Sequence, residues 1–363
     1  MKTIARHEIA PRSWWQALAL ERREMLRLLA VAGLTATLPR RGEAAASEIV
    51  VSNWGGSAEE AVKTAFTDLC LAATGRSIAV DGSGPLPGKI KAMVEAHQVI
   101  WDVADLGFGD IAELGRAGLL EPIDYAIVDR SQVLPGLATE WGLGNYLFSY
   151  IFAVNEAKLK GPSPKTWADF FNLKDFPGRR ALPGSLSHGV WEAALMADGV
   201  ASDELYPIDV DRALAKIKTI KAETVFWKSG AQSEDLLREG EVLASLMWSN
   251  RAVVVRRQQK QINWTWDRAI LSASSWGVPK GNPAGREAVM KFLQISTDPK
   301  AQAKVFEIVA MSPSNPAGSA QIPPAEQASN ATAYASQQVM INDDWYSANG
   351  DASHARYLEV ISS

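Results

Sequence analysis

The strongest constraint on the fold is a regular alternation of strand-like and helix-like runs along the chain. In the first third, the strand-like runs are 48–52, 78–80 and 103–106, and the helix-like runs that follow them are 57–74, 89–97 and 111–117. Apolar residues in the helix-like runs recur at three- and four-residue spacing. Strands that alternate with helices usually build a mainly parallel sheet covered by helices on both faces. We therefore expect an α/β protein.

The alternation restarts in the second half of the chain. Helices are expected at 166–171, 187–197, 209–221, 233–237, 249–259 and 284–297, and strands at 180–182, 225–227 and 242–247. Two longer extended stretches, 146–154 and 270–278, separate these regions. We expect them to cross between two lobes, lobe 1 from residues 47–149 plus 279–325 and lobe 2 from 150–278. The tail, 326–363, is expected to pack on the lobes.

The first 46 residues have the layout of a cleaved export signal. Paired Arg22 and Arg23 precede an apolar run at 28–38, and three alanines follow at 44–46. The run is too short to span a membrane, which takes roughly 20 residues of helix. The paired arginines indicate the twin-arginine route. The prediction is a soluble periplasmic protein that starts near Ser47; an amphipathic helix of a cytoplasmic protein is the alternative.

Charge and cysteine content exclude several other classes. The leader holds 8 of the 37 Lys and Arg and 4 of the 41 Asp and Glu, so the remaining chain has a net charge of about −8. Such a charge opposes nucleic-acid binding. The single Cys70 can form no internal disulfide or zinc site, and it lies too far from Ser47 for a lipid anchor. We expect Cys70 in the core, and a monomer without metal or cofactor.

Catalytic motifs are missing from the sequence. The stretch 184–189 has the wrong spacing for a nucleophile elbow. The stretch 82–89 resembles a phosphate-binding loop, but Ser83 replaces a required glycine and Ile90 the hydroxyl residue. The three histidines after the leader are not at metal-ligand spacing. We expect a protein that is not an enzyme; an exported enzyme that uses the cleft is the remaining alternative.

Four strand-to-helix turns are the expected place of a ligand site, because ligands collect outside the carboxyl ends of strands. They are 54–57, 107–110, 183–188 and 248–251. Helix N-termini there favour an anionic group. Arg251 lies in the first turn of its helix, where a cation opposes the helix dipole. A carboxylate ligand would explain this position; an ordinary surface salt bridge is the alternative.

Several segments resemble a known family. They are 50–56, 89–95, 101–106, 118–124, 164–170, 176–182, 229–232, 278–281 and 313–316. In order and spacing they are similar to the periplasmic solute-binding proteins of ABC importers, of the spermidine/putrescine-binding type. The resemblance implies the two-lobed type II clamshell, each lobe a mainly parallel sheet flanked by helices, joined by crossing hinge strands. It also implies two partners, a small solute and an ABC permease in the inner membrane.

The resemblance carries over to the ligand residues only in part. Trp54 and Trp248 match cleft tryptophans of the family, but Arg251 and Ser274 stand where the polyamine binders place acids. At an effective dielectric constant near 20, a like-charge contact at 4 Å costs about 4 kcal/mol. We therefore predict a carboxylate-bearing or zwitterionic solute; a polyamine held by Asp102, Asp105 or Asp110 is the alternative.

The predicted ligand-binding residues come from the four turns and the second crossing. Three tryptophans would wall the ligand, with core packing as the alternative for each. The full set is Trp54, Gly55, Ser57, Gly107, Ser185, His188, Trp248, Arg251, Ser274 and Trp276.

Overall fold

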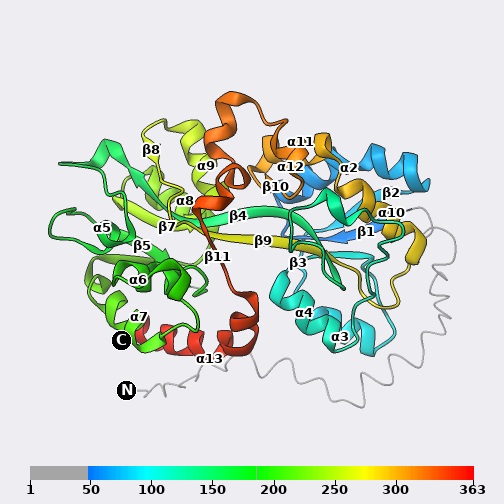
Figure 1. The fold of residues 1–363 in the computed structure, drawn as a ribbon, viewed down its shortest axis with the longest axis horizontal. Helices are drawn as coiled ribbons and strands as arrows, with labels where there is room; N and C mark the ends of the chain where they lie inside the picture. The colour runs from blue at the N-terminus through cyan, green and yellow to red at the C-terminus, as the bar shows by residue number, and fades with distance from the viewer. Residues whose placement is uncertain (1–47, 185) are drawn as a thin grey trace, which may run out of the picture. The chain divides into compact units, whose positions relative to one another are not determined.

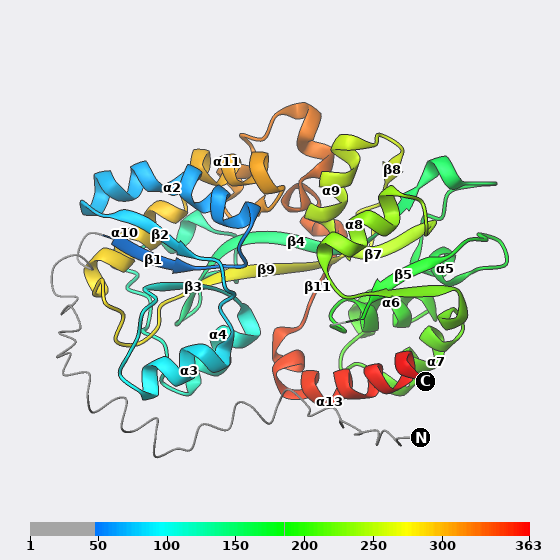
Figure 2. The ribbon, with the colours of Figure 1, turned by 180° about the vertical axis from the view of Figure 1, so that it is seen from behind.

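The computed structural model describes residues 48–184 and 186–363. They form one mixed sheet with helices on both faces (Figure 1 and, from behind, Figure 2). The strands across the sheet are, in order, β2 (Ser77–Asp81), β1 (Glu48–Ser52), β3 (Val103–Gly107), β9 (Ile270–Gly277), β4 (Gly142–Asn155), β7 (Ala244–Trp248), β5 (Arg180–Pro183) and β6 (Thr224–Trp227). Short strands β8 (Ile262–Asn263), β10 (Ser312–Pro313) and β11 (Val339–Met340) pair with β4 or β9. The expected α/β class is confirmed.

Strand direction divides the sheet into three parts. Strands β2, β1 and β3 are mutually parallel, and we call them the first strand group. Strands β7, β5 and β6 are likewise parallel and form the second strand group. Between them, β9 and β4 are antiparallel to each other and to their outer neighbours. The long central pair runs through the middle of the sheet (Figure 1).

One face of the sheet carries a continuous apolar core. It is covered by α2 (Ser57–Thr74), α8 (Gly230–Arg238), α9 (Ser249–Gln258), α10 (Arg286–Ser296) and α11 (Pro299–Val309), with the short α12 (Pro316–Ser319) beside α11. Phe66 of α2 packs edge-on against Phe292 of α10, with ring centroids 6.3 Å apart. Cys70 is buried in this core, as expected.

On the opposite face, the buried apolar residues divide into two clusters. Helices α3 (Pro87–Glu95) and α4 (Phe108–Arg116) cover the first strand group around Trp101 and Ile111. Helices α5 (Trp167–Phe171), α6 (Val190–Ala197), α7 (Val210–Lys218) and α13 (Asp343–Ser362) cover the second around Phe170 and Trp191. Because the two clusters do not merge in the described residues, this face has room for a cleft at the middle of the central pair.

Local sequence signals explain several helix ends. Thr166, where the helix at 166–171 was expected to start, caps α5 in a reciprocal capping box with Asp169. Gly75, directly after the expected run 57–74, ends α2 in a left-handed conformation. At the start of α2, Gly56 is the cap residue and Ser57 is already helical, so the serine does not cap this helix. None of the helices in the described part of the chain is long and apolar enough to cross a membrane.

The two expected crossings and the tail differ in how well the sequence predicts them. The stretches 146–154 and 270–278 correspond to β4 and β9, although β4 begins four residues earlier than expected, at Gly142. Helix α11 and the 20-residue α13 were not predicted. Residues 1–47, which include the predicted export signal, lie outside the described residues.

Candidate ligand-binding site

The ends of the two strand groups point at each other along the central pair. Strand β3 ends at Gly107, which pairs with Ser274 of β9. Strand β7 ends at Trp248, which pairs with Tyr150 of β4 and, through it, with Ile270 of β9. The two ends are therefore four β9 residues apart, about 13 Å at the usual rise of a strand. We call this interval the central gap.

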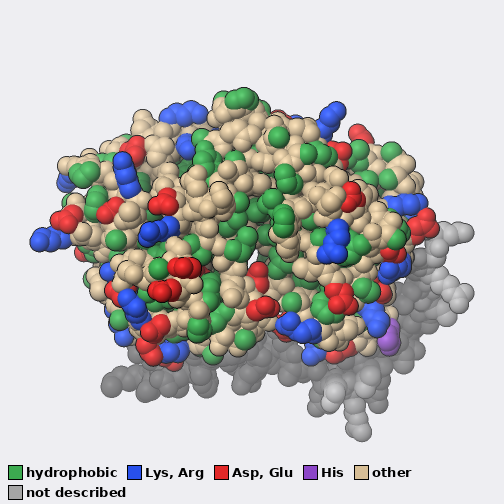
Figure 3. All heavy atoms as spheres, viewed as in Figure 1, with side chains coloured by type: hydrophobic (Ala, Val, Ile, Leu, Met, Phe, Trp, Pro, Cys, Tyr) green, Lys and Arg blue, Asp and Glu red, His purple; other side chains and the backbone are tan. Residues whose placement is uncertain are grey.

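Helix N-termini gather on both sides of the central gap, because every strand of the two parallel groups ends there. Helices α2 and α4 start on one side, and α6, α8 and α9 on the other. On the face shown in Figure 3, a hollow near the middle is bordered by hydrophobic side chains and by acidic groups. The sequence predicted the strand at 225–227. It did not predict that the turn after this strand, where α8 starts at Ser229 and Gly230, would lie at the site.

Alternate residues of β4 line the central gap with aromatic rings. The centroids of Tyr146 and Phe148 lie 6.3 Å apart, and those of Phe148 and Tyr150 lie 5.7 Å apart. The three rings therefore share one face of the strand across the gap. Sequence reasoning missed this ladder, although the alternating Tyr-Leu-Phe-Ser-Tyr was visible in the first crossing. Such rings can pack on an aliphatic chain or attract an ammonium group.

Arg251 and Trp248 form the second side of the gap. Arg251 Nη1 donates to Glu234 Oε1 of α8 at 3.0 Å, so a salt bridge of the kind considered as the alternative is present. Even so, 39% of the Arg251 side chain stays exposed, whereas only 11% of Glu234 does. Trp248 packs edge-on against the buried Trp227, with centroids 5.4 Å apart. The guanidinium is thus held from behind while part of it faces solvent.

Trp54 and Gly55 stand on the first side, after β1. The Gly55 N–H donates to Asn53 Oδ1 at 2.9 Å, and Gly55 has a φ of +71°. A Cβ at Gly55 would lie 2.6 Å from the Gly82 carbonyl oxygen, so only glycine fits this turn. The turn presents Trp54 with 54% of its surface exposed, and Ser57 is also exposed. An exposed tryptophan on a fixed turn suits ligand contact.

Two acidic residues of the chain itself lie at the N-terminus of α4. Asp110 lies in the first turn of α4, and Asp343, the first residue of α13, lies against Gly109. Burial and the nearby Asp110 raise the pKa of Asp343 to about 6. The helix end at Gly107, which was expected to favour an anionic ligand group, therefore has two acids beside it, and their charges oppose an anion there.

Ser274 lies against Asp105 instead of facing the gap. Its hydroxyl donates to Asp105, which also accepts from Tyr146 Oη at 3.1 Å. Asp105 is 2% exposed, and burial raises its pKa to about 6. The structure therefore corrects the assignment of Ser274 as a ligand residue: its hydroxyl helps to hold a buried acid. Asp102 is similarly committed, since it accepts from the backbone N–H groups of Val50 and Ala284.

Trp276 is the clearest error among the predicted site residues. It has 0% exposed surface and packs edge-on against Phe292, with centroids 5.8 Å apart. Trp276 belongs to the core between the sheet and α10. For this tryptophan, the alternative of core packing is therefore the correct one.

His188 belongs to the loop before α6. The His188 ring stacks on Tyr346 of α13 with centroids 4.1 Å apart, and burial lowers its pKa to about 4. Tyr346 in turn donates to Glu192 at 2.9 Å. A neutral His188 under an aromatic ring supports α13 and does not carry charge at neutral pH. Ser185 lies outside the described residues.

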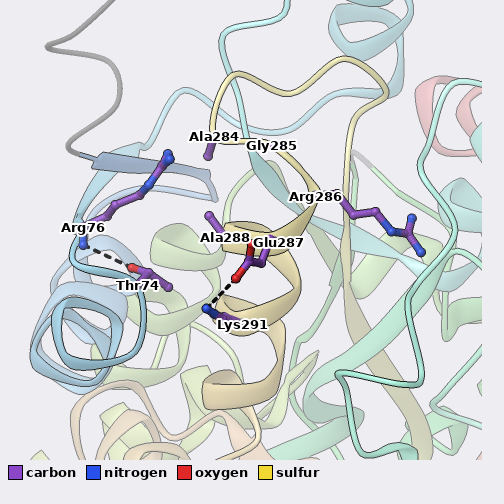
Figure 4. Close-up of a pocket in the computed structure, with 8 residues that line it drawn as sticks. All are labelled: Thr74, Arg76, Ala284, Gly285, Arg286, Glu287, Ala288 and Lys291. Atoms are coloured by element: carbon purple, nitrogen blue, oxygen red, sulfur yellow. Dashed lines mark hydrogen bonds and ion pairs between the residues drawn. The ribbon is translucent and has the colours of Figure 1, made fainter.

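A second hollow, of about 410 Å³, lies at the start of α10 (Figure 4). It is lined by Thr74, Arg76, Ala284, Gly285, Arg286, Glu287, Ala288 and Lys291. Lys291 is paired with Glu287 at 2.7 Å. None of the predicted site residues lines it, so it is separate from the central gap. Within the described residues there is no cluster of side chains suited to a metal ion.

Two opposed strand groups, with aromatic rings and a partly exposed arginine between their ends, are an arrangement suited to binding a small polar solute. The family comparison agrees, since residues 62–335 match the model of the bacterial extracellular solute-binding proteins. The chain belongs to this family. The expected solute-binding function is thus confirmed, and the chain is a binding protein and not an enzyme.

Three relatives show how close the similarity is. The chain is 31% identical over 271 residues to the gamma-aminobutyric acid-binding protein of Pseudomonas aeruginosa, covering 73% of this chain and 76% of that one. The solved Atu4243–GABA receptor is 33% identical with a TM-score of 0.81, over 87% and 98% of the two chains. AgtB of A. tumefaciens R10 in complex with agropinic acid is 32% identical with a TM-score of 0.73, over 87% and 99%. These similarities confirm the expected fold.

Proposed function

We propose that the protein captures a small zwitterionic or carboxylate-bearing solute in the central gap and delivers it to an ABC permease. The observation that carries the proposal is the place of Arg251. It stands in the first turn of α9, 39% of its side chain is exposed, and its salt-bridge partner among the described residues is a more deeply buried acid. A ligand carboxylate could take the remaining donors of the guanidinium in a charge-assisted hydrogen bond.

The opposite side of the gap suits the other end of a zwitterion. Asp110 and Asp343 surround the start of α4 without a salt bridge to a lysine or arginine in the described residues. The aromatic ladder of β4 lies between this acidic side and Arg251. A ligand with a carboxylate at one end and an ammonium group at the other would match both sides. The named ligands of two relatives, γ-aminobutyric acid in each case, have this chemistry.

A polyamine fits these residues less well. Of the three acids considered for that ligand, Asp102 and Asp105 are buried and hydrogen-bonded within the fold. Only Asp110 remains near the gap, and Arg251 would face the second ammonium group. The spermidine/putrescine-binding type therefore describes the fold of the chain better than its cargo.

Closure of the cleft would be a hinge motion of two lobes on β4 and β9. The lobes would be 47–149 plus 279–325 and 150–278, since these two strands alone join the strand groups across the gap in the central path of the sheet. The tail would act on both sides, because Asp343 contacts Gly109 while Tyr346 contacts His188. Hinge bending of two strands is a common route to ligand capture.

Export would follow the twin-arginine route and place the protein in the periplasm. The family description, extracellular, supports an address outside the cytoplasm. Replacement of Arg22 and Arg23 by lysine should block export, and undiminished export would indicate the general secretory route.

The proposed cargo is tested by a ligand panel. Thermal shift is measured with ω-amino acids, α-amino acids, opines, monocarboxylates and diamines, and native mass spectrometry identifies any ligand that survives purification. Stabilisation by a carboxylate-bearing class, absent for putrescine and spermidine, is expected. Stabilisation by diamines alone would refute the proposal.

A further inference from the structure

We infer that Glu234 is a positioning residue for ligand specificity: it fixes Arg251 so that its guanidinium discriminates a carboxylate from its uncharged analogues. The inference rests on the proposed function and extends it to α8, which holds none of the predicted ligand residues. Glu234 itself is too deeply buried to contact a ligand directly, with 11% of its side chain exposed.

The first observation is the ion pair itself. Glu234 uses one carboxylate oxygen for each of two arginines, Oε1 for Arg251 at 3.0 Å and Oε2 for Arg238 at 3.3 Å. Arg238 is also paired with Asp235 at 2.5 Å. Because a second cation fixes the carboxylate, the oxygen that receives Arg251 Nη1 has a defined place.

The second observation is the close approach of Gly230 to the stem of Arg251. A Cβ at position 230 would lie 2.9 Å from Arg251 Nε and 3.0 Å from Trp248 Cζ3. The guanidinium is thus confined between the start of α8, the Trp248 ring and Glu234. Arg251 Nε is buried and has no hydrogen-bond partner, so the donors left for a ligand belong to the exposed outer edge of the guanidinium.

A long side chain that is fixed before binding loses less conformational entropy when the ligand arrives. A free arginine on the first turn of α9 would sample several rotamers, and each encounter with a carboxylate would have to order it. Holding Nη1 in place leaves the outer edge of the planar guanidinium correctly aimed at the gap. Glu234 therefore contributes to affinity only for ligands that use Arg251.

Glu234 could instead weaken ligand binding, and an experiment must distinguish this effect from positioning. A carboxylate next to Arg251 lowers the local positive potential and competes with the ligand. If competition dominated, removal of the Glu234 charge would strengthen binding. If positioning dominates, the same change weakens binding of carboxylates and leaves the amide analogue unaffected.

The test is a double-mutant cycle read by calorimetry on the purified protein, with γ-aminobutyric acid and its amide, 4-aminobutanamide, as probes. Glu234→Gln is expected to weaken γ-aminobutyric acid binding roughly threefold to tenfold. In the background of Arg251→Met, Glu234→Gln is expected to change nothing further. Glu239→Gln, an exposed acid at the end of the same helix, is the matched control and should bind as the wild type does.

A second variant tests the same idea through shape. Gly230→Ala should displace Arg251 and reduce the preference for the acid over the amide, with Glu234 intact. The crystal structure of Glu234→Gln should show the guanidinium moved away from its original place.

Two results would overturn the positioning role while keeping the proposed function. They are unchanged or tighter binding of γ-aminobutyric acid in Glu234→Gln, and an equal loss for acid and amide. If the wild type binds neither γ-aminobutyric acid nor any other carboxylate, the proposed function itself fails and this inference with it.

Discussion

Asp105 is the residue whose replacement tests the electrostatics of the central gap most simply. It is 2% exposed, and burial raises its pKa from 3.8 to about 6. An acid whose pKa is higher in the folded state favours folding in its protonated form. The fold is therefore progressively destabilised as the pH rises from about 4 to about 6, and the effect is complete above that range. A shift of about two pKa units corresponds to roughly 3 kcal/mol.

Asp105→Asn should remove most of this destabilisation. The amide is close in shape to the acid and can still accept a hydrogen bond from Tyr146. Ser274 can donate to the Leu106 carbonyl, which lies 3.2 Å away, and accept from the new amide. Allowing about 1 kcal/mol for imperfect hydrogen bonds, we expect a gain of about 2 kcal/mol at pH 7.5.

The measurement is the free energy of unfolding by urea for both proteins at pH 4 and pH 7.5. The variant should be more stable only at pH 7.5, and its stability should depend less on pH between 4 and 6. Glu239→Gln, whose side chain is exposed, is the control for a change of net charge. A variant less stable than the wild type at pH 7.5 would show that ionised Asp105 is stabilised by its partners, which would refute the reasoning.

Three further predictions concern residues of the expected site and its surroundings. Trp276→Ala should lower the free energy of unfolding by about 3–5 kcal/mol, because Trp276 is wholly buried. Trp54→Ala should change the free energy of unfolding by less than about 0.5 kcal/mol and weaken ligand binding. Calorimetric unfolding would contradict this if Trp54→Ala were the more destabilised variant. Asp343→Asn should raise the melting temperature at pH 7.5 but not at pH 4, since the pKa of Asp343 is raised to about 6; an equal shift at both values would argue against a buried charge. Gly189→Ala should destabilise the fold by roughly 1–3 kcal/mol, because a Cβ there would lie 2.4 Å from the Tyr150 ring at a φ of +76°. Unchanged urea unfolding would show that the start of α6 can move away from Tyr150 of β4 without a loss of stability.

The fold was largely predictable because its signals are local and periodic. The alternation of strands and helices identified the α/β class, and the lengths of the two extended crossings distinguished β4 and β9 from the shorter strands. The tail gave less information, since α13 contains glycine, asparagine and serine and has only a weak apolar stripe. It is held by contacts distant in sequence, such as Tyr357 Oη to the Pro183 carbonyl at 2.6 Å.

The candidate site could be located from the sequence, but the contacts of its side chains could not. The carboxyl ends of the strands pointed to Trp54, Trp248 and Arg251, and the structure places these residues at the two sides of the gap. The direction in which a side chain points could not be predicted in the same way. Trp276 lies at the end of a strand like Trp248, yet it faces the core and not the gap.

Long-range partners explain the remaining differences. Asp343 reaches the start of α4 from more than 200 residues away, and Glu234 reaches Arg251 from a neighbouring helix. Neither pairing leaves a local sequence signal. Both change the charge of the site, which is why the sequence predicted an anion-attracting α4 end that the structure does not have.

The proposed role of Arg251 is to receive a ligand carboxylate in the gap between the two strand groups. Isothermal titration of the wild type and of Arg251→Met with γ-aminobutyric acid and with putrescine tests it most directly. We expect the wild type to bind γ-aminobutyric acid and not putrescine, and Arg251→Met to bind it at least about tenfold more weakly. Tight putrescine binding by the wild type, unchanged in Arg251→Met, would contradict the account.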